Sequence, residues 1–202
     1  GNITVNGISY RTADQDTLRS VHGKFGILFQ DAALFDSMNV YDNIAFGLRR
    51  KKIPENEIGS IIPRMLEQVG LRGIEEKKPS ELSGGMQKRV GLARAIVMDP
   101  QIILYDEPTT GLDPLMTDTI NQLIVQTQKR LNMTTFIISH DLEAAMNIAD
   151  KLAVLYRGEI VADGSPEQVR QSTHPFVQAS IRGVAFEDDD QSCLSGFDRR
   201  DA

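Results

Sequence analysis

The sequence predicts an α/β fold whose central feature is a mostly parallel β-sheet. From residue 82 onward, short apolar runs alternate with longer segments that have helical spacing. Two of the apolar runs, residues 102–105 and 134–138, contain no charged side chain, and within two residues they are followed by Asp106 and His140. Continuous apolar strands that alternate with helices are typical of a parallel sheet with helices on both faces. We therefore expect polar side chains at the carboxyl end of a buried sheet.

The N-terminal part begins with a hairpin signal. Asn6-Gly7 separates two short apolar runs, and both residues tolerate the positive φ that a two-residue hairpin turn requires. Residues 11–24 are polar and rich in turn formers, whereas residues 25–29 have the character of a buried strand. Residues 31–80 have a mostly helical pattern and are expected to form a helical segment.

The remainder of the chain continues the alternation of helices and strands. In order, we expect a helix from Ser83, a strand at residues 102–105, a helix at 115–131, a strand at 134–138, a helix from Asp141 to about Ile148, a hairpin at 152–162 and a short helix near Ser165-Pro166. We interpret residues 1–182 as one partial domain. Residues 183–202 are acidic and poor in apolar side chains, so we expect a flexible tail there.

Composition excludes several classes of protein. The 202 residues include 41% hydrophobic and 25% charged residues, which is typical of a globular protein. No apolar run approaches the roughly 18–20 residues that a membrane-spanning helix needs, and no signal peptide is visible. The net charge of −6 argues against general nucleic-acid binding. Cys193 is the only cysteine, so neither an internal disulfide nor a thiolate metal site is expected.

The segment Leu82-Ser83-Gly84-Gly85-Met86-Gln87-Lys88-Arg89 has the chemistry of an anion site. Ser83 and the two glycines open a helix, where main-chain N–H groups and the positive end of the helix dipole favour a phosphate. Ser is also an ideal N-cap residue, so a purely structural role is the alternative. Two glycines in the first helical turn disfavour that alternative, because glycine weakens a helix unless close approach of a ligand requires it.

Acidic and imidazole side chains follow the two apolar strands. Asp106 and Glu107 come at the end of the first, and His140 follows the second. Carboxylates at a strand end suit a metal-bound phosphate, and a histidine can donate a hydrogen bond to it. Gln30 follows the earlier strand, at residues 25–29, in the same manner. Alone, each of these residues is compatible with an ordinary surface or helix-cap role, and their order along the chain carries the prediction.

Taken together, these segments resemble the ABC (ATP-binding cassette) ATPases up to about residue 170. The resemblance implies a P-loop NTPase-like core with antiparallel hairpins, an inserted helical subdomain at residues 31–80, a signature motif at 82–86 and a Walker B strand at 102–107. It implies ATP and Mg²⁺ as ligands. It also implies a second ATPase protomer, because ATP sites in this family are shared across a head-to-tail dimer.

The resemblance assigns a role to each matched residue. Asp106 would hold the Mg²⁺ shell, Gln30 would reach the metal or the attacking water, and Glu107 would act as general base. His140 would contact the γ-phosphate. The residues that would bind nucleotide are Ser83, Gly84, Gly85, Met86, Gln87 and, across the dimer seam, Asp113.

A more specific resemblance concerns residues 29–44, which read Phe-Gln-Asp-Ala-Ala-Leu-Phe-Asp-Ser-Met-Asn-Val-Tyr-Asp-Asn-Ile. This segment is similar to the Mla-type, lipid-asymmetry transporter ATPases, as are residues 70–73 and Met at the fifth position of the signature. The resemblance implies a transport ATPase for phospholipid or another hydrophobic substrate. It places the protein on the cytoplasmic face of the bacterial inner membrane, where residues 31–80 contact integral-membrane permease subunits.

One family element does not occur in the 202 residues: the phosphate loop, G-x-x-x-x-G-K-S/T. The strand before that loop and the helix after it are expected to be absent too. Without the lysine and the main-chain nest of this loop, we expect these residues alone not to hydrolyse ATP. We interpret the sequence as part of a longer product. A chain that only donates residues 83–85 to a partner's nucleotide is the alternative, and a sheet without its central strand is expected to be poorly stable.

Proteins other than transport ATPases use the same motifs. A chromosome-maintenance ATPase would insert long heptad helices between Gln30 and Ser83, and a two-cassette translation factor would carry a second set of motifs. Neither feature occurs. A non-hydrolysing scaffold or regulatory subunit has no need for both Glu107 and His140, yet it remains an alternative, as does an importer ATPase for a polar solute.

Overall fold

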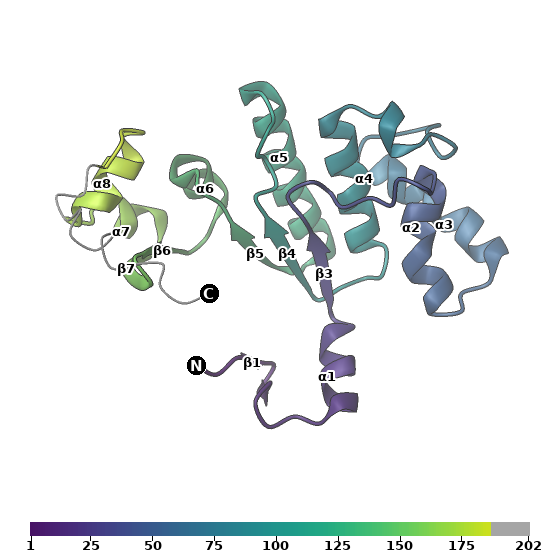
Figure 1. Ribbon diagram of the computed structural model, residues 1–202, viewed down its shortest axis with the longest axis horizontal. Helices are drawn as coiled ribbons and strands as arrows, with labels where there is room; N and C mark the ends of the chain where they lie inside the picture. The colour runs from purple at the N-terminus through teal and green to yellow at the C-terminus, as the bar shows by residue number, and fades with distance from the viewer. Residues whose placement is uncertain (187–202) are drawn as a thin grey trace, which may run out of the picture. The chain divides into compact units, whose positions relative to one another are not determined.

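A three-stranded parallel sheet is the centre of the first of two units in the computed structural model, which describes residues 1–186 (Figure 1). The first unit comprises residues 1–140, and the second begins at Asp141. Most of the predicted acidic tail, including Cys193, lies outside the described residues. None of the helices in the described part of the chain combines the length and hydropathy that a bilayer-spanning segment requires.

The central sheet consists of β3 (Phe25–Leu28), β4 (Ile102–Asp106) and β5 (Thr134–Ile138), in that spatial order. Both pairs of neighbouring strands are parallel. The predicted parallel sheet is therefore confirmed, and the carboxyl ends of all three strands lie at one edge.

One face of this sheet packs on helices. It presents Gly26 and Leu28 from β3 and Ile103 and Tyr105 from β4, all buried. They share a core with α4 (Gly84–Ile96) and α5 (Pro114–Leu131). Close approach of α4 requires the glycine, because a Cβ at residue 26 would lie 2.4 Å from the main-chain oxygen of Ala95.

The opposite face is open at three apolar positions. The exposed fraction is 39% for Ile27, 60% for Phe136 and 54% for Ile138. The register aligns Ile27 with Leu104 and Leu104 with Phe136, so these side chains belong to the same face. The expectation of a sheet covered on both faces is therefore wrong for these positions. The strands are apolar on both sides, but the core formed with α4 and α5 takes in the other face.

Helices between β3 and α4 form the predicted helical segment. They are α2 (Val40–Arg50), α3 (Glu55–Gln68) and the short 3-10 helix η1 (Pro79–Glu81). Asn39 caps α2 by accepting a hydrogen bond from the N–H of Asp42 at 2.8 Å. Buried side chains of α2 and α3 pack with α4 in the same core, so this layer extends the covered side of the sheet.

The N-terminal residues form the predicted hairpin, β1 (Thr4–Val5) with β2 (Ile8–Ser9), and Asn6 and Gly7 both have positive φ. Residues 11–24, interpreted as turns, instead contain the helix α1 (Gln15–His22). Asp14 caps this helix by accepting from the N–H of Thr17 at 2.7 Å. That cap was the available signal, because an Asp whose carboxylate can accept from the N–H three residues later is typical of a helix start.

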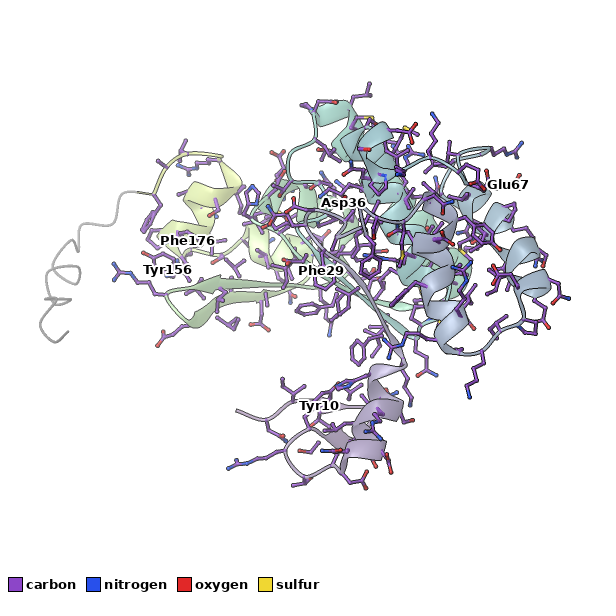
Figure 2. All side chains as sticks on the ribbon, turned by 45° about the vertical axis from the view of Figure 1, so that its right-hand side comes forward. Tyr10, Phe29, Asp36, Glu67, Tyr156 and Phe176 are labelled. Atoms are coloured by element: carbon purple, nitrogen blue, oxygen red, sulfur yellow. The ribbon has the colours of Figure 1, made fainter. Side chains whose placement is uncertain are left out.

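The second unit has its own small core. It contains α6 (Leu142–Ile148), the hairpin β6 (Leu152–Tyr156) and β7 (Glu159–Gly164), α7 (Pro166–Arg170) and α8 (Pro175–Ile181). The hairpin predicted at residues 152–162 is confirmed, and its turn residues Arg157 and Gly158 both have positive φ. The helix α8 was not predicted, and its Phe176 stacks on Tyr156 of β6 with 4.3 Å between the ring centroids (Figure 2).

Candidate functional site

The predicted polar residues gather where the parallel strands end. Asp106 is the last residue of β4, while Gln30 and His140 each follow a neighbouring strand by two residues. The register pairs Leu28 with Tyr105 and Asp106 with Ile138, so the three segments leave the sheet at the same level. This edge is where open α/β sheets bind ligands.

Glu107 is the most constrained of these residues. Its main chain is in the left-handed region, with a φ of +47°, and its N–H donates to the oxygen of Ile138 at 3.0 Å. Its carboxylate accepts from the N–H of His140 at 2.9 Å and from the hydroxyl of Thr110 at 3.0 Å. A non-glycine residue in this conformation persists only where its surroundings hold it, as they do here.

The imidazole of His140 also contacts that carboxylate. Nδ1 lies 2.8 Å from Oε2 of Glu107, and because an ionised carboxylate only accepts, Nδ1 carries the proton. The Glu107 side chain is 18% exposed, whereas that of His140 is 75% exposed. The histidine therefore bridges a sheltered carboxylate and the space outside the strand ends.

The residues at this edge suit a magnesium ion that brings its own water and phosphate ligands. Asp106 and Gln30 are both exposed, and they offer one carboxylate and one amide oxygen. No cluster of three or more His, Cys, Asp or Glu side chains that could hold a metal occurs among residues 1–186. Mg²⁺ is typically held by one or two carboxylates together with water and substrate phosphates, so the sparse ligand set fits that ion.

The signature segment forms the N-terminus of α4. Ser83 is the N-cap, and its hydroxyl accepts from the N–H of Met86 at 3.3 Å. Ser83 and Gly84 are exposed, but Gly85 is buried, and a Cβ there would lie 2.4 Å from Cε of Met116 on α5. Packing against α5 thus requires a glycine at position 85, in addition to the predicted approach of a ligand. The exposed surface that could bind an anion is formed by Ser83 and Gly84.

The remaining predicted nucleotide contacts turn their side chains toward the chain itself. Met86 packs against the core, and the amide of Gln87 donates to the oxygen of Pro79 at 2.9 Å. Asp113 is exposed and caps α5, with its carboxylate accepting from the N–H of Met116 at 3.0 Å. Nucleotide contacts by Met86 and Gln87 remain predictions. Because both side chains are engaged within the chain, such contacts would be made by their main-chain atoms.

Lys88, which is not among the predicted site residues, joins the two parts of the site. Lys88 of α4 is buried, and its ammonium donates to the main-chain oxygens of Gln30 and Glu107, the latter at 3.3 Å. Burial lowers the pKa of Lys88, and the charges of Asp31 and Glu107 partly oppose that effect. A signal was present, because Lys88 lies four residues before the buried Leu92 and so shares the inward face of the helix.

Two further polar side chains, the buried Asn43 and the half-buried Arg94, hold the loop at residues 29–39. The side chain of Asn43 accepts from the N–H of Phe35 at 2.8 Å and donates to the oxygen of Asn39 at 2.9 Å. Arg94 donates to the oxygens of Ala32 and Ala33, both at 2.8 Å. Both alanines have positive φ, so these bonds keep the loop in a conformation that alanine rarely adopts.

Beside this loop lies an apolar hollow with a volume of about 450 Å³. Phe29 and Phe35 belong to the loop, Phe46 to α2, and Arg94 and Met98 to the region of α4. Part of this lining lies in residues 31–80, the segment expected to contact a permease, and part lies outside it.

Comparison with known proteins supports the resemblance to the ABC ATPases. The family model for "ABC transporter" matches residues 1–110. Over 184 residues the chain is 44% identical to "Probable ribonucleotide transport ATP-binding protein mkl" of Mycobacterium leprae, covering 91% of this chain and 53% of that protein. Over 184 residues it is 40% identical to "Intermembrane phospholipid transport system ATP-binding protein MlaF" of Haemophilus influenzae, covering 91% and 70%. The chain thus spans about half the length of the first of these relatives.

Solved structures share the fold. One is cbiO1 from Clostridium perfringens, part of the ABC transporter complex cbiONQ, with a TM-score of 0.73 and 32% identity over 84% of this chain and 68% of that one. Another is a dimer of the ATP-binding cassette MJ0796 in a post-hydrolysis state bound to ADP and Pi, with a TM-score of 0.72 and 27% identity over 82% and 73%. The predicted fold and the likeness to the Mla-type ATPases are confirmed. The chain belongs to the ABC transporter family.

Proposed function

We propose that the full-length protein is the ATP-hydrolysing subunit of an ABC transporter. The observation that carries this proposal is the arrangement of Glu107, His140 and Thr110 at the ends of β4 and β5. A carboxylate that is sheltered, hydrogen-bonded and adjacent to an exposed imidazole has no evident use in a scaffold. It is suited to activate water beside a bound phosphate.

The chemistry assigned to these residues is hydrolysis of the γ-phosphate of ATP. Glu107 accepts a proton from the attacking water, whose oxygen bonds to phosphorus as the bond to the β-phosphate oxygen breaks, giving ADP and phosphate. Oε2 already accepts from Thr110 and from Nδ1 of His140, so Oε1, with one donor, is the oxygen with capacity for the water. Asp106 and Gln30 would hold Mg²⁺, which when bound neutralises phosphate charge.

The signature segment is assigned to the nucleotide of a second protomer. Ser83 and Gly84 are exposed at the tip of α4, where main-chain N–H groups and the helix dipole favour phosphate. Asp113 is exposed on the next loop and fits the predicted position at the dimer seam. A homodimer with sites shared head to tail follows from this assignment. Because the phosphate loop is not among the 202 residues, we expect this segment alone to be inactive in hydrolysis.

The apolar hollow beside the loop at residues 29–39 is assigned to the permease. Its lining of Phe29, Phe35 and Phe46 suits an apolar segment of a membrane subunit, and each of these rings is partly exposed. Contact with such a subunit would hold the protein on the cytoplasmic face of the inner membrane. The hollow lies beside the Gln30 loop, so movement of the permease would reach the nucleotide site directly.

For the cargo, we propose phospholipid or another hydrophobic molecule, on the basis of the likeness to MlaF. The likeness to a protein named for ribonucleotide transport favours a polar solute as the second candidate. The two are separated by measuring which of them stimulates ATP hydrolysis when the protein is assembled with its permease in liposomes.

The decisive test of the proposed function is ATP hydrolysis by the full-length natural protein. Glu107→Gln keeps the shape of the side chain but removes the base, and it should lower kcat by about 10²–10⁴-fold while ATP still binds. Glu57→Gln, an exposed position on α3, is the matched control and should behave as wild type. A wild-type protein that binds ATP without hydrolysing it would favour the non-hydrolysing scaffold instead. Wild-type hydrolysis by Glu107→Gln would refute the assignment of the base.

A further inference from the structure

Lys88 is one of three buried polar residues in the described chain, the others being Asn43 and Thr127, and it is the one that carries a charge. Burying an ammonium is unfavourable unless it is hydrogen-bonded. Lys88 meets that need with main-chain oxygens from two separate segments, those of Gln30 and Glu107. The residue is therefore placed between two loops rather than within one.

Those two segments carry the catalytic assignments of the site. Gln30 follows β3 by two residues, and Glu107 follows β4 directly. The main chain of Glu107 has a φ of +47°, and its oxygen is the atom that Lys88 contacts. An ammonium on that oxygen opposes relaxation of the peptide unit that carries the carboxylate. The same ammonium ties this unit to the loop of Gln30.

We infer that Lys88 is a positioning residue that holds the main chain of Glu107 in its left-handed conformation and fixes its separation from the Gln30 loop. It acts from α4, so the helix whose N-terminus carries Ser83 also holds both catalytic segments. The consequence for hydrolysis rests on the proposed function above. The structural part of the inference does not, because it concerns only atoms of this chain.

Arg94 provides a matched comparison. It lies on the same helix and donates to the main-chain oxygens of Ala32 and Ala33, in the loop that begins near Gln30. Its guanidinium donates to that loop and not to Glu107, so loss of its charge tests the loop alone.

The first experiment measures amide hydrogen exchange in the 202-residue chain. Lys88→Met keeps the buried stem and removes the ammonium, and it should speed exchange at the Glu107 amide, which donates to Ile138, by roughly tenfold or more. Arg94→Met should speed exchange in residues 31–35 and leave Glu107 unchanged. Lys88→Arg, which restores a charged donor, should recover at least half of the protection. Equal protection of Glu107 in wild type and Lys88→Met would overturn the inference.

If Lys88→Met does not fold, Lys88→Gln takes its place, since its neutral amide retains donors. The same shift in exchange is expected with a smaller size, and wild-type protection at Glu107 would again overturn the inference.

The second experiment measures ATP hydrolysis by the full-length natural protein. Lys88→Met should lower kcat by up to about 10²-fold with KM nearly unchanged, because a displaced base slows chemistry more than binding. Arg94→Met should have a much smaller effect on kcat, and Lys88→Arg should restore most of it. An effect of Lys88→Met no larger than that of Arg94→Met would overturn the catalytic part. Absence of hydrolysis in wild type would instead count against the proposed function, while the exchange experiment still decides the placement of Glu107.

Discussion

The two faces of the central sheet differ more than their sequences do. On one face, Leu28, Ile103 and Tyr105 are buried in a core with α4 and α5. On the other, Ile27, Phe136 and Ile138 are just as apolar and yet exposed. Successive side chains of a strand point to opposite faces of the sheet, so these strands are apolar on both faces although only one is covered. An exposed apolar face of this kind is typical of a surface that packs against other residues.

This difference also concerns the candidate site, because the site lies at the ends of strands that have one covered face and one open face. On the covered side, Asn43 of α2 and Arg94 of α4 hold the loop after β3 by hydrogen bonds. In the described sheet, β3 and β5 are the two edge strands, and β5 carries Phe136 and Ile138 of the open face. We therefore expect stability to depend on the covered face and association or aggregation to depend on the open one.

The largest effect should come from the covered face. Ile103→Ala removes a fully buried side chain from the middle of β4 and should lower the free energy of unfolding by about 2–5 kcal/mol. Urea unfolding followed by circular dichroism measures this change. A loss below about 1 kcal/mol would mean that this face is not the organising core.

A smaller loss should follow from adding one methyl group to the same face. In Gly26→Ala the new Cβ would lie 2.4 Å from the main-chain oxygen of Ala95, so α4 must shift, with an expected loss of about 1–3 kcal/mol. The matched control is Gly59→Ala on α3, where the atom nearest to a new Cβ is the Tyr41 hydroxyl oxygen at 3.9 Å. The comparison is made by urea unfolding, and equal losses would show that the close approach of α4 is not what matters.

An ion-pair cluster on the surface of the helical layer should contribute less to the free energy of unfolding than the buried face does, and its contribution should decrease at acidic pH. Arg49 pairs with Asp42 at 2.7 Å and with Glu55 at 2.8 Å. Its hydrogen bond lowers the pKa of Glu55, so that stabilisation is present above the ordinary pKa of a glutamate and is lost as pH falls through the lowered value. Arg49→Met should therefore lower Tm slightly at pH 7, by an amount that shrinks as the pH falls through the lowered pKa of Glu55. A difference that grows toward pH 3 would contradict this assignment.

The smallest effect on stability is expected on the open face. Phe136→Ser in the 202-residue chain should change the free energy of unfolding by less than about 0.5 kcal/mol and should reduce aggregation, measured by light scattering. The same substitution in the full-length natural protein sharpens the comparison. A loss above about 2 kcal/mol there would show that other residues bury this face in the whole protein.

Much of this architecture was predictable from local sequence. The Asn6-Gly7 and Arg157-Gly158 turns, the three parallel strands and the start of α4 at Ser83 all follow from turn chemistry, apolar runs and helix capping. The helix α1 was missed because its polar sequence hides a short amphipathic element. Its start depends on the single cap at Asp14.

Local sequence sets which residues end the strands, so Gln30, Asp106, Glu107 and His140 lie near one edge, since parallel strands place their carboxyl ends together. The contacts that hold these residues come from the packing of the folded chain. The left-handed main chain of Glu107 and the reach of Lys88 depend on contacts between residues far apart in the chain. Local sequence patterns indicate which positions are buried and with what periodicity. The partners of the buried Lys88 depend instead on how α4 packs against the sheet.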